Sequence, residues 1–241
     1  GEAAGDKFGT SVSISSDGKR VAIGAPKNAG NGADAGHVRV YAESGGTWTQ
    51  LGGDIDGEAA GDEFGDSVSI SSDGTRVLVG APGNDGNGAD SGHARVYVYN
   101  SVTPAWEQLG GDIDGEAAGD SAGRSVSISG DGTHVAVGAP NAGPGYTRVY
   151  TYDAAKTTAP AKWAQVGSDV IGQCRSGASS STRVVDHADC SAGTTSQRDN
   201  AGSGVSLSSD GSQLAMGATE ALGSQWLWWS TGNVRIFTSN T

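Results

Sequence analysis

Oxygen-bearing side chains stand at short spacing in the glycine-rich stretch GNDGNGADSG, residues 83–92. Asp85, Asn87 and Asp90 could together ligate a calcium ion, because Ca²⁺ takes several oxygen ligands and a flexible loop lets them converge. Asn and Asp are also the ordinary residues of tight turns, so a solvated acidic loop is the alternative. The corresponding stretches do not keep the pattern, since one holds Asn28, Asn31 and Asp34 and the other only Asn141.

A second set of carboxylates belongs to Asp-Gly pairs, at Asp17, Asp73, Asp131 and Asp210. Such a pair can form part of a calcium loop, in which other acidic side chains flank the glycine, or the tight turn of a β-hairpin. Around Asp17 the other ligand positions hold Ser13, Ser15 and Val21. One carboxylate per loop is too few for calcium, so hairpin turns are predicted.

Tryptophans concentrate in the stretch EALGSQWLWWSTG, residues 220–232. Trp226, Trp228 and Trp229 are three of the six tryptophans in the chain. On an exposed loop they would anchor a protein partner or stack on a sugar; alternatively, they cover a neighbouring part of the same chain. Asp62 and Asp120, from two matching acidic runs, are the other candidate partner-binding residues.

Two cysteines, Cys174 and Cys190, lie in a polar, serine-rich insertion. A disulfide between them is predicted, because this segment offers little apolar cover for a free thiol. It would close a loop of about 15 residues and contribute on the order of 3 kcal/mol. Free buried thiols are the alternative. A disulfide favours an oxidising, extracellular setting.

The histidines do not assemble into a recognisable catalytic motif. His37 and His93 recur at one position of a repeat, which indicates a structural role. His187 could pair with Asp186 or Asp189, but no strained nucleophile elbow, phosphate loop or zinc-type Cys and His spacing accompanies it. We therefore predict that the chain is not an enzyme.

All these residues sit on an internal repeat. GEAAGD begins at residues 1, 57 and 115, SVSIS begins at 11, 67 and 125, and a weaker copy, GVSLSSDGSQLAMGAT, begins at 204. Within a copy, Ser alternates with Val and Ile as in a strand, an Asp-Gly turn follows, and two more apolar strands precede a segment marked by Trp48, Trp106 or Trp163. Four antiparallel strands per repeat at this period predict the blades of an all-β propeller.

The repeat resembles a known family. Phe8-Gly9 with Gly24-Ala25-Pro26, and Phe64-Gly65 with Gly80-Ala81-Pro82, are similar to the FG-GAP repeats of the integrin α-subunit propeller and related cell-surface proteins. The third copy has Ala122-Gly123, and the fourth is aligned on Ser203-Gly204 with Gly217-Ala218-Thr219. The resemblance implies a propeller, seven-bladed in that family, with calcium held at its hairpin loops.

The copies divide the chain, residues 1–241, into a single repeat array. We expect blade 1 at about 8–56, blade 2 at about 64–114, blade 3 at about 122–171, an insertion at 172–201, and an incomplete blade 4 at about 202–239. The fourth copy lacks the Trp-bearing strand, so the array is predicted to be part of a larger propeller. A closed four-bladed ring or an open stack is the alternative.

The formal net charge of −12 works against nucleic acid or an anionic membrane surface as a partner. No apolar run approaches the length of a membrane span, and the first residues carry no signal-peptide pattern.

We predict an extracellular or cell-surface binding and adhesion module, which contacts a protein or glycan through the loops that join strands 2 to 3 and 4 to 1. A structural subunit of a secreted fibre or surface appendage, assembled from copies of itself, is the alternative. Calcium is the one cofactor that the sequence suggests.

Overall fold

The inner strand of each repeat forms where Ser alternates with Val or Ile, because this alternation gives the strand one small polar side and one apolar side. The computed structural model describes residues 1–156, 162–172, 200–219 and 233–238, and the backbone of 174–175, 184–185 and 197–198. In this part of the chain every regular element is a β-strand. Among these residues no helix could cross a membrane.

Three repeats form five-stranded antiparallel sheets, and the fourth forms a three-stranded one. Blade 1 contains β1 (Ser11–Ile14), β2 (Arg20–Ala25), β3 (His37–Ser44), β4 (Thr47–Gln50) and β5 (Ile55–Asp56). Blade 2 contains β6 (Ser67–Ile70), β7 (Arg76–Ala81), β8 (His93–Asn100), β9 (Ala105–Gln108) and β10 (Ile113–Asp114). Blade 3 contains β11 (Ser125–Ile128), β12 (His134–Ala139), β13 (Tyr146–Tyr152), β14 (Trp163–Gln165) and β15 (Val170–Ile171). Blade 4 contains β19 (Ala201–Leu207), β20 (Gln213–Ala218) and β21 (Asn233–Thr238). Within the predicted insertion, β16 (Cys174–Arg175) pairs with β17 (Val184–Val185) and β18 (Gln197–Arg198).

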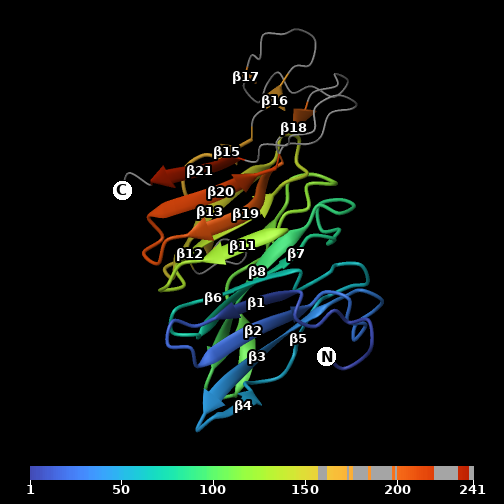
Figure 1. Ribbon diagram of the computed structural model, residues 1–241, viewed down its shortest axis with the longest axis vertical. Helices are drawn as coiled ribbons and strands as arrows, with labels where there is room; N and C mark the ends of the chain where they lie inside the picture. Colours follow the sequence, from blue (N-terminus) through green and yellow to red (C-terminus); the bar gives the residue numbers. More distant parts are fainter. Residues whose placement is uncertain are drawn as a thin grey trace.

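The predicted all-β propeller is confirmed. The four blades stand side by side along the long axis of the molecule, with consecutive inner strands β1, β6, β11 and β19 next to one another (Figure 1). One detail of the prediction was wrong, because the fourth strand is not continuous. In blade 1, β4 and β5 both pair with β3, and the intervening chain turns through Gly52, whose φ is 77°.

Small side chains on the inner strands join one blade to the next. Ser11 Oγ donates to Gly65 O at 2.7 Å, and Ser13 Oγ accepts the amide hydrogen of Ile70 at 3.1 Å. The same two bonds recur at the next interface, where Ser67 donates to Gly123 O and Ser69 accepts from the Ile128 amide. Serine is therefore required here for its hydroxyl group as well as its size.

The glycines of the Phe-Gly and Gly-Ala-Pro motifs touch each other across the interface. A Cβ atom placed on Gly24 would lie 2.0 Å from Gly65 O, and one on Gly80 would lie 1.9 Å from Gly123 O. Real Cβ atoms do not approach an oxygen so closely, so only glycine allows the two backbones to meet. The two motifs are thus two halves of one contact between successive blades.

This contact corrects the alignment of the fourth repeat. A Cβ on Gly138 would lie 2.2 Å from Gly202 O, and Ala201 forms the parallel bridge that Ala122 forms in blade 3. The equivalent of Phe-Gly is therefore Ala201-Gly202, and the prediction of Ser203-Gly204 was wrong by two residues. Gly204 stands where the other copies have the bridging serine, because it pairs with Gly217 as Ser125 pairs with Gly138.

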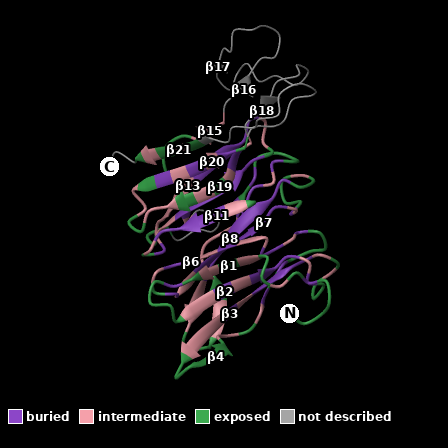
Figure 2. Cartoon of the chain, viewed as in Figure 1, coloured by how far each residue is buried: buried purple, intermediate pink, exposed green. Residues whose placement is uncertain are grey.

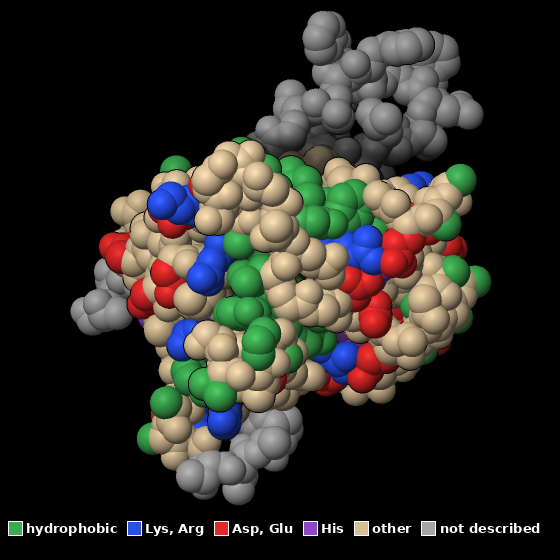
Figure 3. All heavy atoms as spheres, turned by 90° about the horizontal axis from the view of Figure 1, so that it is seen from below, with side chains coloured by type: hydrophobic (Ala, Val, Ile, Leu, Met, Phe, Trp, Pro, Cys, Tyr) green, Lys and Arg blue, Asp and Glu red, His purple; other side chains and the backbone are tan. Residues whose placement is uncertain are grey.

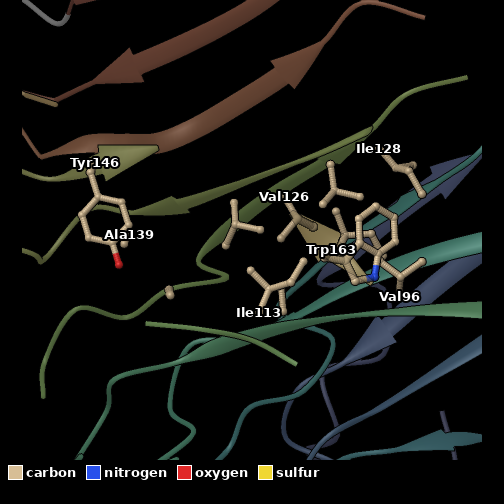
Figure 4. Close-up of a cluster of buried hydrophobic side chains, with 12 residues drawn as sticks. Val96, Ile113, Val126, Ile128, Ala139, Tyr146 and Trp163 are labelled. Atoms are coloured by element: carbon tan, nitrogen blue, oxygen red, sulfur yellow. The ribbon is translucent and has the colours of Figure 1, made fainter. Parts of the chain in front are cut away.

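Apolar side chains fill the spaces between blades. Between blades 2 and 3, Val96 and Ile113 pack against Val126, Ile128 and Trp163 in one buried cluster (Figure 4). A second cluster joins blades 1 and 2. Burial is accordingly deepest in the middle blades and decreases in blade 1 (Figure 2).

The outer face of blade 1 is uncovered. Val12 and Ile14 of β1 are 63% and 59% exposed, whereas their counterparts in β6, Val68 and Ile70, are 9% and 7% exposed. Figure 3 shows apolar side chains gathered in a band on this face. In the described part of the chain, blade 4 has an uncovered face as well, on which Val234 is exposed. The described blades bury their faces against neighbouring blades.

Candidate functional site: the link face

The links between strands 2 and 3 and between successive blades meet on one face, here called the link face, as the strand directions predict. Asn84 Nδ2, from the link after β7, donates to Asp62 Oδ2 at 3.2 Å, and Asn87 Nδ2 donates to Gly115 O at 2.8 Å. Asp62 and Gly115 lie in the links that lead into blades 2 and 3. The face is therefore built from polar side chains that fasten one link to another.

Asp62 and Asp120, predicted as partner-binding residues, point into the protein. They are 3% and 7% exposed. Asp62 Oδ2 accepts the amide of Ala59 at 3.2 Å, and Asp120 Oδ2 accepts the amide of Ala117 at 3.0 Å. Each carboxylate holds its own turn in shape, so neither is available at the surface to touch a partner.

The candidate calcium ligands are engaged in the closure of their own loop. Asp85 Oδ1 accepts a hydrogen bond from the backbone amide of Asp90 at 2.9 Å, and the side-chain amide of Asn87 donates to Gly115 O. Asp90 itself has a φ of 53°, a left-handed conformation that Asp tolerates better than most residues. These bonds are those of an Asx-stabilised turn. Calcium at this loop stays a prediction.

A charged triad that sequence reasoning missed recurs on the link face of three blades. In blade 2, Arg95 binds Asp112 through Nε at 2.7 Å and Nη2 at 2.6 Å, and Nη2 also lies 2.6 Å from Glu58. The other two triads are Glu2–Arg39–Asp54 in blade 1 and Glu116–Arg148–Asp169 in blade 3. The arginines recur in VRV, ARV and TRV, but their partners come from links distant in the sequence.

The triads combine a buried cation with an exposed anion. The guanidinium of Arg39 holds the pKa of Asp54 below its usual range. Arg95 and Arg148 are buried, whereas the side chains of Glu58 and Glu116 are 52% and 63% exposed. The geometry therefore fixes one glutamate of each link at the surface with its carboxylate already oriented.

Two of the triads have a histidine beside them. The ligand atoms of Glu58, His93 and Asp112 lie within 4.8 Å of one another, as do those of Glu2, His37 and Asp54. Both histidines are buried, and their Nε2 atoms have no hydrogen-bond partner. Burial lowers the pKa of His93 and favours its neutral form. The carboxylates of both groups, however, already form ion pairs with Arg39 or Arg95. A metal ion would have to compete with these arginines for the same oxygens.

The hairpin turns on the opposite face confirm the turn interpretation. Ser15 Oγ donates to Asp17 Oδ1 at 2.6 Å, and the same oxygen accepts the amide of Lys19 at 2.9 Å. The equivalent bonds to Ser208 and Ser212 lower the pKa of Asp210 to about 2. These carboxylates stabilise the turn, and each turn holds a single carboxylate, whereas a calcium ion takes several oxygen ligands.

Several predicted sites lie outside the described residues. They are the tryptophans Trp226, Trp228 and Trp229, the residue His187, and Cys190 together with the side chain of its predicted disulfide partner Cys174. These assignments stay predictions.

The repeats are similar to those of a known protein family. The family model of the FG-GAP repeat matches residues 1–41 and 55–99. The second of these ranges contains both glycines that meet their counterparts in neighbouring blades. The chain is a β-propeller that contains FG-GAP repeats. No curated protein matches it.

Solved structures similar to this FG-GAP propeller have little sequence in common with it. Hydrazine synthase of Kuenenia stuttgartiensis is 17% identical at a TM-score of 0.48, over 95% of this chain and 51% of that one. TolB of Acinetobacter baumannii is 16% identical at 0.44, over 95% and 43%. The periplasmic gluconolactonase of Pseudomonas aeruginosa is 16% identical at 0.45, over 87% and 52%. The FG-GAP propeller spans about half the length of these proteins.

Proposed function

We propose that this FG-GAP propeller is an extracellular binding and adhesion module that contacts a protein or glycan through its link face, and that it is not an enzyme. The observation that carries the proposal is the row of exposed glutamates, Glu2, Glu58 and Glu116, at the same place in three successive blades. Each forms an ion pair with an arginine that is buried or half-buried, so little side-chain entropy is lost when a partner binds.

The charge of the row indicates the kind of partner. The chain carries a net charge of −12, and Arg95 and Arg148 of the triads are buried. A protein patch rich in Lys and Arg, or a glycan with amino groups, would be attracted to the row. FG-GAP repeats are typical of extracellular proteins, which supports a role outside the cell.

The test is binding to an array of neutral and amino-bearing glycans and to purified basic matrix proteins. We expect at least one binder, with affinity on the order of tenfold weaker for the double variant Glu58→Gln, Glu116→Gln, because exposed ion pairs set association rates. Glu107→Gln in β9, which removes one exposed carboxylate away from the link face, is the control and should bind as the parent does. Equal binding by all variants would refute this face as the contact.

A further inference from the structure

A cavity of about 350 Å³ lies between blades 3 and 4, away from the link face. Blade 3 contributes Val149, Val166 and Gly167 to its walls, and blade 4 contributes Leu214 and Phe237. Most of this lining is apolar. The equivalent space exists at the two preceding interfaces between blades. There, a side chain of the following blade fills it.

At both preceding interfaces the space holds a tryptophan from the following blade. Trp106 of blade 2 donates from Nε1 to Leu51 O of blade 1 at 2.8 Å. Trp163 of blade 3 donates in the same way to Leu109 O of blade 2, also at 2.8 Å. Val166 is the counterpart of Leu51 and Leu109, because each follows a Trp-x-Gln sequence. The carbonyl oxygen of Val166 is thus placed to receive a third indole.

A glycine follows Leu51, Leu109 and Val166, and this glycine borders the space for the indole. A Cβ on Gly52 would lie 3.0 Å from Cδ1 of Trp106, and a Cβ on Gly110 would lie 2.8 Å from Cδ1 of Trp163. At Gly167 a Cβ would meet nothing within 4 Å. Blade 3 therefore keeps the glycine that makes room for an indole, and no indole of the described residues lies against it.

Among the described residues, the edge of blade 4 beside the cavity has no partner strand. In blades 1 to 3 the third strand pairs with two outer segments, and Gln50 and Gln165 lie opposite Tyr41 and Tyr150. In the described part of blade 4, β21 pairs with β20 alone, and Phe237 occupies the position of these tyrosines. An unpaired strand edge beside an apolar pocket is the arrangement by which proteins bind an extended peptide as an added strand.

We propose that this cavity, together with the edge of β21, is a binding site for an extended peptide that carries tryptophan in the Trp-x-Gln form of the chain's own fourth strands. The peptide adds a strand to blade 4 and places its indole against Gly167. The indole N–H donates to Val166 O, as Trp106 and Trp163 do to their neighbours. The site is independent of the link face and of the proposed function.

The test uses a labelled synthetic peptide of residues 105–114, AWEQLGGDID, and fluorescence anisotropy with the whole chain. We expect saturable binding, and roughly 30-fold weaker binding by a peptide with Trp106→Ala, because a buried tryptophan is the typical anchor of such a contact. Absence of binding, including absence because another segment already fills the cavity, would overturn the proposal.

The matched protein variant is Gly167→Asn. Asn tolerates the φ of 70° at this position, and its Cβ enters open space, so the variant should keep the parent's melting temperature. The added side chain occupies the place of the incoming indole, so peptide affinity should fall at least as far as with the Trp106→Ala peptide. A Gly167→Asn protein that binds the peptide as well as the parent does would show that the peptide binds elsewhere.

Discussion

Gly80→Ala will lower the free energy of unfolding by about 3 kcal/mol or more, although it adds a single methyl group. The new Cβ would lie 1.9 Å from Gly123 O and 2.5 Å from Ser67 Oγ, and the first of these atoms belongs to the backbone of the next blade. Relief requires the two blades to separate, so the cost lies at or above the upper end of the range for overpacked sites. Denaturant unfolding followed by tryptophan fluorescence measures the change.

Gly217→Ala is the matched control. Gly217 occupies the same position in blade 4, but the nearest atom to its Cβ would be Gly204 O at 3.5 Å. We expect a change within about 1 kcal/mol of zero, on the stabilising side, because alanine in a strand loses less backbone entropy than glycine does. Equal destabilisation by the two substitutions would mean that strand conformation, and not the contact between blades, requires glycine.

Phe64→Ala will destabilise the protein by about 3–5 kcal/mol, and a second substitution, His93→Tyr, will restore part of the loss. Phe64 is fully buried and lies edge-on to Tyr97 with ring centroids 6.0 Å apart, so its removal leaves a large cavity. Blade 3 shows how the space can be filled differently. There, Ala122 replaces the phenylalanine, and Tyr146 replaces the histidine in the same buried cluster.

A double-mutant cycle tests this exchange. Because the two sites fill one space, their effects should not add, and we expect a coupling of at least about 1 kcal/mol in favour of the pair. His93→Tyr alone overfills the space and should be destabilising. If the double variant is destabilised by the sum of the single effects, then Tyr146 does not compensate for the missing phenylalanine of blade 3.

Much of the fold could be predicted from the sequence because the repeats are nearly identical. Alternation in SVSIS predicts a strand, and Asp-Gly predicts the turn that Asp17 then closes. Burial could not be predicted from the same letters. Val12 and Val68 stand in the same five-residue sequence, yet Val12 is exposed and Val68 is buried. The difference arises because a neighbouring blade covers Val68, and none of the described residues covers Val12 in that way.

The candidate site was harder to predict, because its contacts join different repeats. Asp62 and Asp120 looked like surface acids, but their spacing from the preceding amides turns them inward. Arg95 gave a signal, because an arginine recurs inside the apolar third strand of each of the first three repeats, but its partner Glu58 lies in the link from the previous blade. In the fourth repeat, the serines and glycines of GSGVSL allowed an alignment two residues out of register.

Successive repeats stack as blades through their inner strands, and amide hydrogen exchange of individual residues can detect this stacking. The amides of Ile70 and Ile128 donate to Ser13 and Ser69 of the preceding blade. We predict slow exchange at both amides, fast exchange at the uncovered Ile14, and a loss of protection at Ile128 but not at Ile70 in Ser69→Ala. Protection at Ile14 equal to that at Ile70, or protection at Ile128 that survives Ser69→Ala, would contradict this prediction.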